Sequence, residues 1–121
     1  MSDAAADPQS RRTLLVRRVM AHRGQRDELV LHAARDAAGC ERTLRYSDRV
    51  LEFHLEDAER EQLEALLEEY PVFKIRQPET RKSDGSVYVA AVADPKHLAD
   101  FIEDCCRRVY DLPSGYRLRV E

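Results

Sequence analysis

Two neighbouring cysteines, Cys105 and Cys106, are the residues best suited to chemistry, because vicinal thiols can bind soft metals or take part in redox reactions. His97 precedes them on the same predicted helix, but eight residues separate it from Cys105. That spacing is about 12 Å along a helix, which is too far for one metal ion. Since Cys105 also falls on the apolar stripe of that helix, we expect a buried, structural cysteine. We predict no metal ligands and no cofactor.

Carboxylates form a second candidate site, because their spacing places several of them on one face of a helix predicted over 57–70. Such a stripe could hold a cation or supply a general acid and base. However, it lies opposite Leu63 and Leu66, so we expect it to be solvated, without the burial that tunes a catalytic pKa. The sequence also contains no glycine-rich phosphate loop and no nucleophile motif, so we predict no catalytic residues and no enzyme. The stripe consists of Asp57, Glu61, Glu64 and Glu68.

Charge is segregated along the chain, although the whole sequence carries a net charge of only −3. Residues 11–40 hold seven arginines against Asp27, Glu28 and Asp36, a net charge of +4. Residues 52–69 hold eight acids against one arginine, which gives a net charge of −7. Residues 72–82 are basic again, with a net charge of +3. Such a pattern allows the chain to match a second copy of itself or to steer a charged partner.

The basic residues near the N-terminus and in a loop over 76–82 are the candidates for contact with an anionic partner such as nucleic acid. A winged-helix mode is excluded, because the acidic helix over 57–70 would be repelled by phosphates. Binding through the loop and the first helix remains as the alternative function. The candidate contacts are Arg17, Arg18, Arg76, Arg81 and Lys82.

Length and composition indicate one domain. The chain has 121 residues, of which 43% are hydrophobic and 36% charged, enough for a single core with a solvated surface. We predict a flexible tail over 1–10 and one α+β domain over 11–121. No apolar run approaches the roughly 18 residues needed to cross a bilayer, and the first residues do not resemble a signal peptide. We therefore expect a cytoplasmic protein with no membrane contact.

The periodicity of apolar residues predicts the order of the elements. Residues 12–38 show a mostly helical pattern that Gly24 divides in two, and 43–46 with 50–55 form a hairpin. A helix over 57–70, capped by Asp57, ends before Pro71. Strands over 72–77 and 86–93 follow, joined by a long basic loop. Asp94 and Pro95 start a last helix that runs to about Tyr110, before a strand over 116–120.

From Val50 onward this order is βαββαβ, which predicts a ferredoxin-like antiparallel sheet with an added N-terminal helical segment and one hairpin strand. Right-handed crossovers place both later helices on one face of the sheet. The other face is then left to the N-terminal helices or to a partner.

Three stretches resemble a family of small uncharacterised proteins from halophilic archaea. They are PETRK at 78–82, DPKHLADFIEDCCRRVY at 94–110 and LPSGYRLRV at 112–120, so the resemblance covers roughly the last 70 residues. The family has no established activity, and the resemblance therefore implies no functional residue.

These observations lead us to expect a non-enzymatic interaction or regulatory domain that forms a homo-oligomer or docks a protein through its sheet face and N-terminal helices. The segregated charge is the basis of this expectation, and nucleic-acid binding is the alternative.

Overall fold

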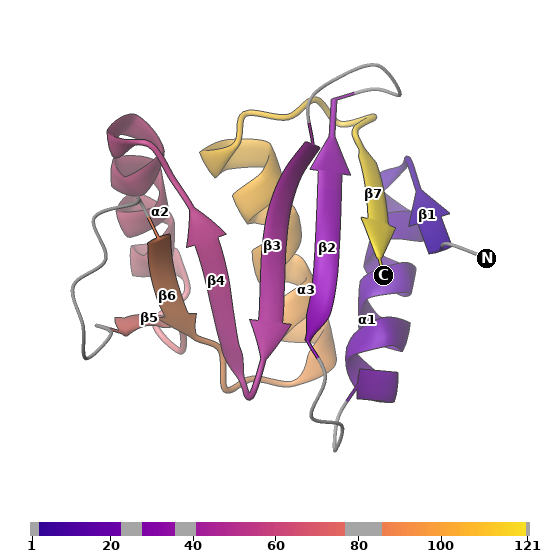
Figure 1. Cartoon of the computed structure of the whole chain (residues 1–121), viewed down its shortest axis with the longest axis horizontal. Coiled ribbons are helices and arrows are strands. Elements are labelled where there is room, and N and C mark those ends of the chain that lie inside the picture. The colour runs from indigo at the N-terminus through magenta and orange to yellow at the C-terminus, as the bar shows by residue number, and fades with distance from the viewer. Residues whose placement is uncertain (1–2, 23–27, 36–40, 77–85, 121) are drawn as a thin grey trace.

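The protein was analysed as a computed structural model, which describes residues 3–22, 28–35, 41–76 and 86–120. Three helices, a short π-helical turn and seven strands alternate along these ranges (Figure 1). In chain order they are β1 (Asp3–Ala5), α1 (Pro8–His22), β2 (Leu29–Ala34), β3 (Glu41–Ser47), β4 (Val50–His54), α2 (Asp57–Glu69), β5 (Lys74–Arg76), β6 (Ser86–Ala90), α3 (Pro95–Asp104), η1 (Cys105–Val109) and β7 (Arg117–Val120).

All seven strands belong to one antiparallel sheet in the order β1-β7-β2-β3-β4-β6-β5. The middle of the sheet consists of two hairpin-linked strands, β3 and β4, with β2 and β6 beside them. The register pairs Tyr46 with Leu51, and Leu51 with Val89, so buried side chains lie next to each other across the central strands. The α+β class predicted from the sequence is therefore confirmed.

The three helices lie behind the sheet in Figure 1, all on the same face. α1 packs against α3, and α2 packs against η1, so the helices form one layer. A single apolar core fills the space between this layer and the sheet, with Phe53, Phe73 and Phe101 among its largest members. No helix in the described ranges is long and apolar enough to cross a bilayer.

The β3–β4 hairpin was predicted, and the structure confirms it. Its turn is Asp48-Arg49, and both residues have positive φ angles, of 50° and 61°. Two consecutive residues with positive φ are typical of the two-residue hairpin turn whose twist matches that of the strands. Leu51 and Phe53 are buried while Glu52 and His54 face away, as the alternation along this strand predicted.

The two later helices were also predicted, with one difference at a cap. The Asp94 side chain accepts a hydrogen bond of 2.9 Å from the His97 amide, and Pro95 occupies the first turn, as expected. α2, however, is capped by Glu56 rather than Asp57, because Glu56 and Glu59 form a reciprocal capping box. At its C-terminal end α3 widens into η1, where the Tyr110 amide donates to the Cys105 carbonyl at 3.1 Å.

The prediction of a helix for the second half of the N-terminal segment is wrong. Leu29–Ala34 forms strand β2, which pairs with β3 on one side and with β7 on the other. The run LVLHAA is apolar at nearly every position, so periodicity alone does not separate a short helix from a strand buried against a core. Leu29, Leu31 and Ala33 face the core in strand alternation. The predicted break at Gly24 lies outside the described residues.

The sequence predicted a flexible tail over 1–10, and the described part of that segment forms regular structure. Asp3–Ala5 forms β1 on the edge of the sheet, paired with β7, and α1 already begins at Pro8. The Asp7 carboxylate accepts a hydrogen bond of 2.9 Å from the Ser10 amide at the start of α1. A three-residue edge strand is too short to produce a recognisable pattern in the sequence.

From β4 onward, with η1 as the continuation of α3, the elements follow the predicted βαββαβ order. The order of the strands in the sheet, however, differs from that of a four-stranded ferredoxin-like sheet. That arrangement makes the first and last of these strands, β4 and β7, direct neighbours. Here β2 and β3 lie between them. The N-terminal segment thus supplies two central strands, where the sequence predicted one added strand.

Candidate functional site: the open face of the sheet

One face of the sheet carries no helix, and we call its described side chains the open face. Along each strand, buried residues alternate with partly exposed ones that point away from the helices. In Figure 1 this face is turned toward the viewer, and no described helix or loop crosses it. The open face consists of Val30, His32, Glu41, Thr43, Arg45, Ser47, Val50, Glu52, His54, Lys74, Arg76, Ser86, Tyr88, Ala90, Arg117 and Arg119.

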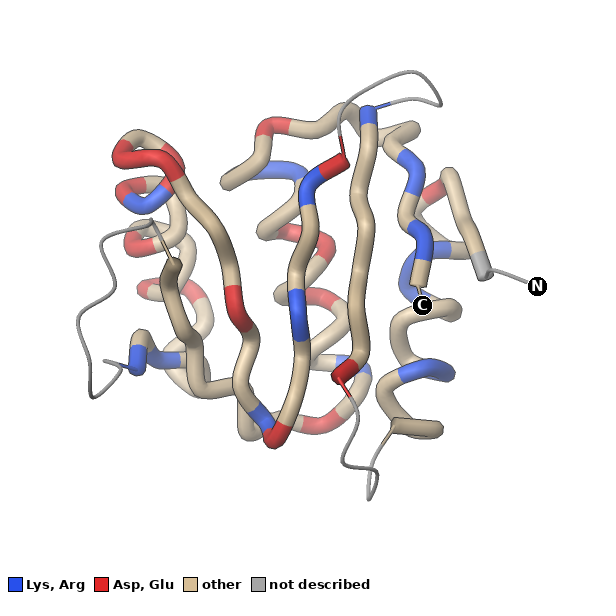
Figure 2. Tube along the Cα trace, viewed as in Figure 1, with Lys and Arg blue, Asp and Glu red and all other residues tan. Residues whose placement is uncertain are grey.

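Charges of both signs occur on the open face, with more cations than acids. Figure 2 shows basic positions along β3, β5 and β7 and acidic positions on β3 and β4. Glu41 forms an ion pair of 3.2 Å with Arg119, and Arg45 lies 3.6 Å from Glu28, which precedes β2. These pairs are exposed and contribute little to folding stability. They leave the charged groups accessible to a partner.

Hydrogen bonds on this face are long. The Tyr88 hydroxyl donates to a Glu52 carboxylate oxygen at 3.4 Å, and the same carboxylate lies 3.8 Å from the His54 ring. Ser86 Oγ lies 3.4 Å from His54 Nδ1. Good hydrogen bonds of these types are about 2.7–3.0 Å long. The Glu52 carboxylate and the His54 ring therefore retain capacity for stronger contacts with another molecule.

The predicted anion contacts do not form one site. Arg17 and Arg18 lie on α1, which runs behind the β1 and β7 edge, whereas Arg76 lies on β5 at the opposite edge. Both Arg17 and Arg18 already interact with other groups of the protein. Arg81 and Lys82, and the loop that contains them, lie outside the described residues.

One of the N-terminal arginines has a different role. The Arg11 side chain is fully buried and donates to both carboxylate oxygens of Glu103, at 2.9 and 2.7 Å. It also donates to the Tyr116 carbonyl at 2.9 Å, and its guanidinium lies 3.8 Å from the centre of the Tyr116 ring. Arg11 therefore joins α1 to α3 and β7, and it is not available to a phosphate.

Cys105 is buried, as expected from the sequence, and its neighbour Cys106 on η1 is buried as well. Cys105 and Cys106 are both free thiols with no exposed surface. Burial raises the pKa of the Cys106 thiol to about 12 and the pKa of Cys105 well above its ordinary value. A protonated thiol is a poor nucleophile and a poor metal ligand. Cys40 lies outside the described residues.

The predicted carboxylate stripe on α2 is exposed, as expected. Asp57, Glu61, Glu64 and Glu68 all face solvent. In the described ranges no three His, Cys, Asp or Glu side chains are grouped so that they could hold a metal ion.

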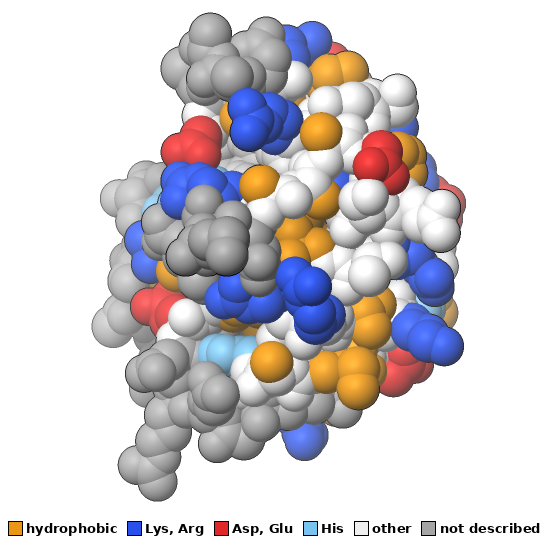
Figure 3. Space-filling model, turned by 90° about the vertical axis from the view of Figure 1, so that its right-hand side faces the viewer, with side chains coloured by type: hydrophobic (Ala, Val, Ile, Leu, Met, Phe, Trp, Pro, Cys, Tyr) orange, Lys and Arg blue, Asp and Glu red, His pale blue; other side chains and the backbone are white. Residues whose placement is uncertain are grey.

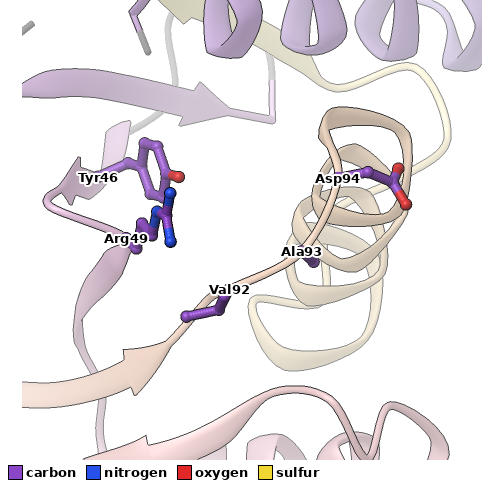
Figure 4. A pocket seen from close by; sticks show the side chains of 5 residues that line it. All are labelled: Tyr46, Arg49, Val92, Ala93 and Asp94. Atoms are coloured by element: carbon purple, nitrogen blue, oxygen red, sulfur yellow. The ribbon is translucent and has the colours of Figure 1, made fainter. Parts of the chain in front are cut away.

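A hollow of about 280 Å³ lies at the end of the sheet, between the β3–β4 turn and the start of α3. Figure 4 shows the Arg49 and Tyr46 side chains together on one side of it, while the Asp94 carboxylate points away from them. Asp94 caps α3, and the Ala91 amide donates to the Arg49 carbonyl at 2.8 Å. Among the described residues that line the hollow, Arg49 is the one cation; it lies beside an exposed Val92, and the Asp94 carboxylate points away from it.

The sequence analysis missed Arg45 and Glu52. Both look like ordinary alternating surface residues, and only the register makes them cross-strand neighbours at the centre of the open face. The signal that could have located them was the alternation of β4, combined with the predicted hairpin.

The fold and the site define a small α+β protein in which one layer of helices leaves a single polar sheet face open. The chain belongs to a family of unknown function, DUF7975, whose family model covers residues 1–121. This extends the resemblance to an uncharacterised family from roughly the last 70 residues to the whole chain. We found no match among curated proteins or among solved structures.

Proposed function

We propose that this protein is a non-enzymatic interaction domain that self-associates through the open face of its sheet. The observation that carries the proposal is the position of α1, α2 and α3 on one face, which leaves the central strands uncovered on the other. That face displays charges of both signs beside Val30, Val50 and Tyr88, each of which is half-buried. A surface that must bind its own copy requires such complementary charges together with apolar contacts.

The oligomeric state in solution tests this proposal. We expect light scattering after size-exclusion chromatography to give a dimer mass for the full chain at high micromolar concentration. Val50→Asp should shift the protein toward the monomer, because it introduces a charge on the open face at β4, one of the two central strands. Val72→Asp is the matched control, because Val72 is 51% exposed and lies outside the open face. A strict monomer in both low and high salt would contradict the proposal.

A second candidate function is nucleic-acid binding, and the basic edge of the molecule favours it. Figure 3 shows several Lys and Arg side chains gathered on the side that carries α1, β1 and β7. Arg17 and Arg117 are exposed there. We expect any phosphate contacts to weaken steeply as salt concentration rises. A gel-shift titration with Arg17→Glu and with the Arg81→Glu, Lys82→Glu double variant tests this function, and Arg17→Glu also separates it from self-association, since Arg17 lies on α1 and not on the open face.

We also propose that the part of the chain from β4 to β7 is a ferredoxin-like unit into which β2 and β3 are inserted. Without these two strands, the sheet order would be β7-β4-β6-β5, with the first and last strands of the βαββαβ unit adjacent. A solved structure of another family member with a shorter N-terminal segment would test this relation: β7 should then pair directly with β4.

A further inference from the structure

The register of the sheet produces a row of side chains whose two halves complement each other. Val30, Arg45, Glu52 and Tyr88 are successive cross-strand partners on β2, β3, β4 and β6. All four project from the open face. The centre of the row falls between β3 and β4, with the cation on one side of it and the acid on the other.

We propose that two copies pack their open faces together about a two-fold axis that runs parallel to the strands, between β3 and β4. This inference rests on the self-association proposed above and specifies its geometry. Such an axis exchanges the two halves of every row. Arg45 of one copy then lies opposite Glu52 of the second copy, and the reverse pair forms at the same time, as a two-fold interface requires.

The charges select this axis over the other two-fold arrangement of stacked sheets. An axis along the row, perpendicular to the strands, would place Arg45 opposite Arg45 and Glu52 opposite Glu52. Like charges in direct opposition are unfavourable, and more so in an interface that excludes water. The axis parallel to the strands brings opposite charges together twice.

Two further pairs of positions fit the same axis. Val30 lies opposite Tyr88 of the second copy, which is an aliphatic contact on an aromatic ring. In the next row Ser47 and Val50 are cross-strand partners. Ser47 of one copy therefore lies opposite Val50 of the second copy, and the reverse pair forms at the same time. Stacked sheets pack about 10 Å apart, with their strands rotated by up to about 30°. This rotation displaces the outer strands most and the central Arg45 and Glu52 least.

Among the described residues of one chain, the contacts of Arg45 and Glu52 with other charged or polar groups are long. Arg45 Nη1 is 3.6 Å from a Glu28 carboxylate oxygen, and the side chains of Arg45 and Glu28 are nearly half exposed. The Glu52 carboxylate has contacts of 3.4 and 3.8 Å with Tyr88 and His54. Both charges can therefore form a shorter pair with the second copy without breaking a strong bond.

Charge reversal tests the geometry. In Arg45→Glu two acids face two acids across the interface, and in Glu52→Arg two cations face two cations. We expect each variant alone to dissociate, with at least about a tenfold weaker association than the wild type measured by sedimentation. An equimolar mixture should restore heterodimers, because every reversed charge then faces its opposite. Restoration in the mixture cannot arise from contacts within one chain.

The Arg60 and Glu64 pair on α2 provides the matched control. These residues are exposed, 3.6 Å apart and one helical turn from each other, in the layer away from the open face. Arg60→Glu, Glu64→Arg and their mixture should associate like the wild type. The neutral variants Arg45→Gln and Glu52→Gln, which add no repulsion, should weaken association less than the reversals and so report on the same pairs if a reversed chain does not fold.

Two results would overturn the inference, and they are distinguishable. If the wild type is a dimer but the mixture of folded reversal variants stays monomeric, the proposed axis is wrong while self-association stands. If the wild type is a monomer at high micromolar concentration, the proposal of self-association is wrong, and the proposed axis is wrong as well.

Discussion

Two adjacent arginines at the start of α1 have different environments. Arg11 is buried and held by Glu103 and Tyr116, whereas Arg12 forms an exposed pair with Asp100 in which both side chains are about half accessible. Both are arginines, and the sequence counts them alike among the seven arginines of residues 11–40. Only the position of α3 beside α1 distinguishes them, and that position depends on contacts about 90 residues apart along the chain.

We expect Arg11→Met to lower the free energy of unfolding by about 3–5 kcal/mol, because it leaves the Glu103 carboxylate without its cationic partner at a mostly buried position. Arg12→Met should change stability little, since solvent screens its pair. Urea titration followed by circular dichroism measures both values. Equal effects of the two substitutions would show that Arg11 does not hold the helices together.

The buried thiols make stability depend on alkaline pH. The ordinary thiol pKa is 9.0, and burial raises that of Cys106 to about 12. Above about pH 9 the unfolded chain loses thiol protons that the folded chain keeps, so the free energy of unfolding falls as pH rises from about 9 to 12. Burial raises the pKa of Tyr116 as well, which adds an effect of the same sign above its ordinary value of 10.0.

We expect Cys106→Ala to make this alkaline slope shallower by up to about 1.4 kcal/mol per pH unit, the contribution of one proton. Urea titrations at intervals of one pH unit from 7 to 11 provide the slopes. An unchanged slope in the variant would mean that Cys106 titrates in the folded protein as it does in the unfolded chain.

At the scale of elements, the sequence predicts a helix or strand correctly where its local signals, such as caps and apolar periodicity, are strong. Asp94 with Pro95, the alternation of β4 and the apolar stripe of α2 each predicted an element that the structure confirms. The errors occurred where the local signal is weak. The stretch LVLHAA fits both the helical and the strand period. It forms a strand because it pairs with β3 and with β7, and β7 lies far away in the sequence.

Capping provides a direct test at this scale. We expect Asp94→Ala to lower the free energy of unfolding by about 1 kcal/mol, because the His97 amide loses its acceptor at the start of α3. Asp57→Ala should cost less, since Glu56 and Glu59 already satisfy the start of α2. Thermal unfolding of the two variants measures the difference. A larger loss for Asp57→Ala would contradict the assignment of Glu56 as the cap.

At the scale of the whole molecule, the segregated charge of the sequence becomes an arrangement in space. The acidic helix α2 and the basic helix α1 lie toward opposite edges of the sheet, and the open face between them carries both signs (Figure 2). The sequence predicted that one face would be covered by the two later helices. It could not decide whether the N-terminal helix would cover the other face, because that depends on the packing of α1 against α3.

If the open face binds a second copy, folding and association are linked, and the thermal midpoint must rise with protein concentration. A tenfold increase in concentration favours the folded dimer by about 1.4 kcal/mol per mole of dimer at 25 °C, since each tenfold change in an equilibrium corresponds to that amount. We therefore expect the thermal midpoint of the wild type to rise as protein concentration increases from about 1 to about 100 μM, measured by calorimetry or fluorescence melts. Arg45→Glu should lose this dependence while the Arg60→Glu control keeps it. A midpoint that is independent of concentration in all three proteins would mean that the open face remains solvated in the folded state.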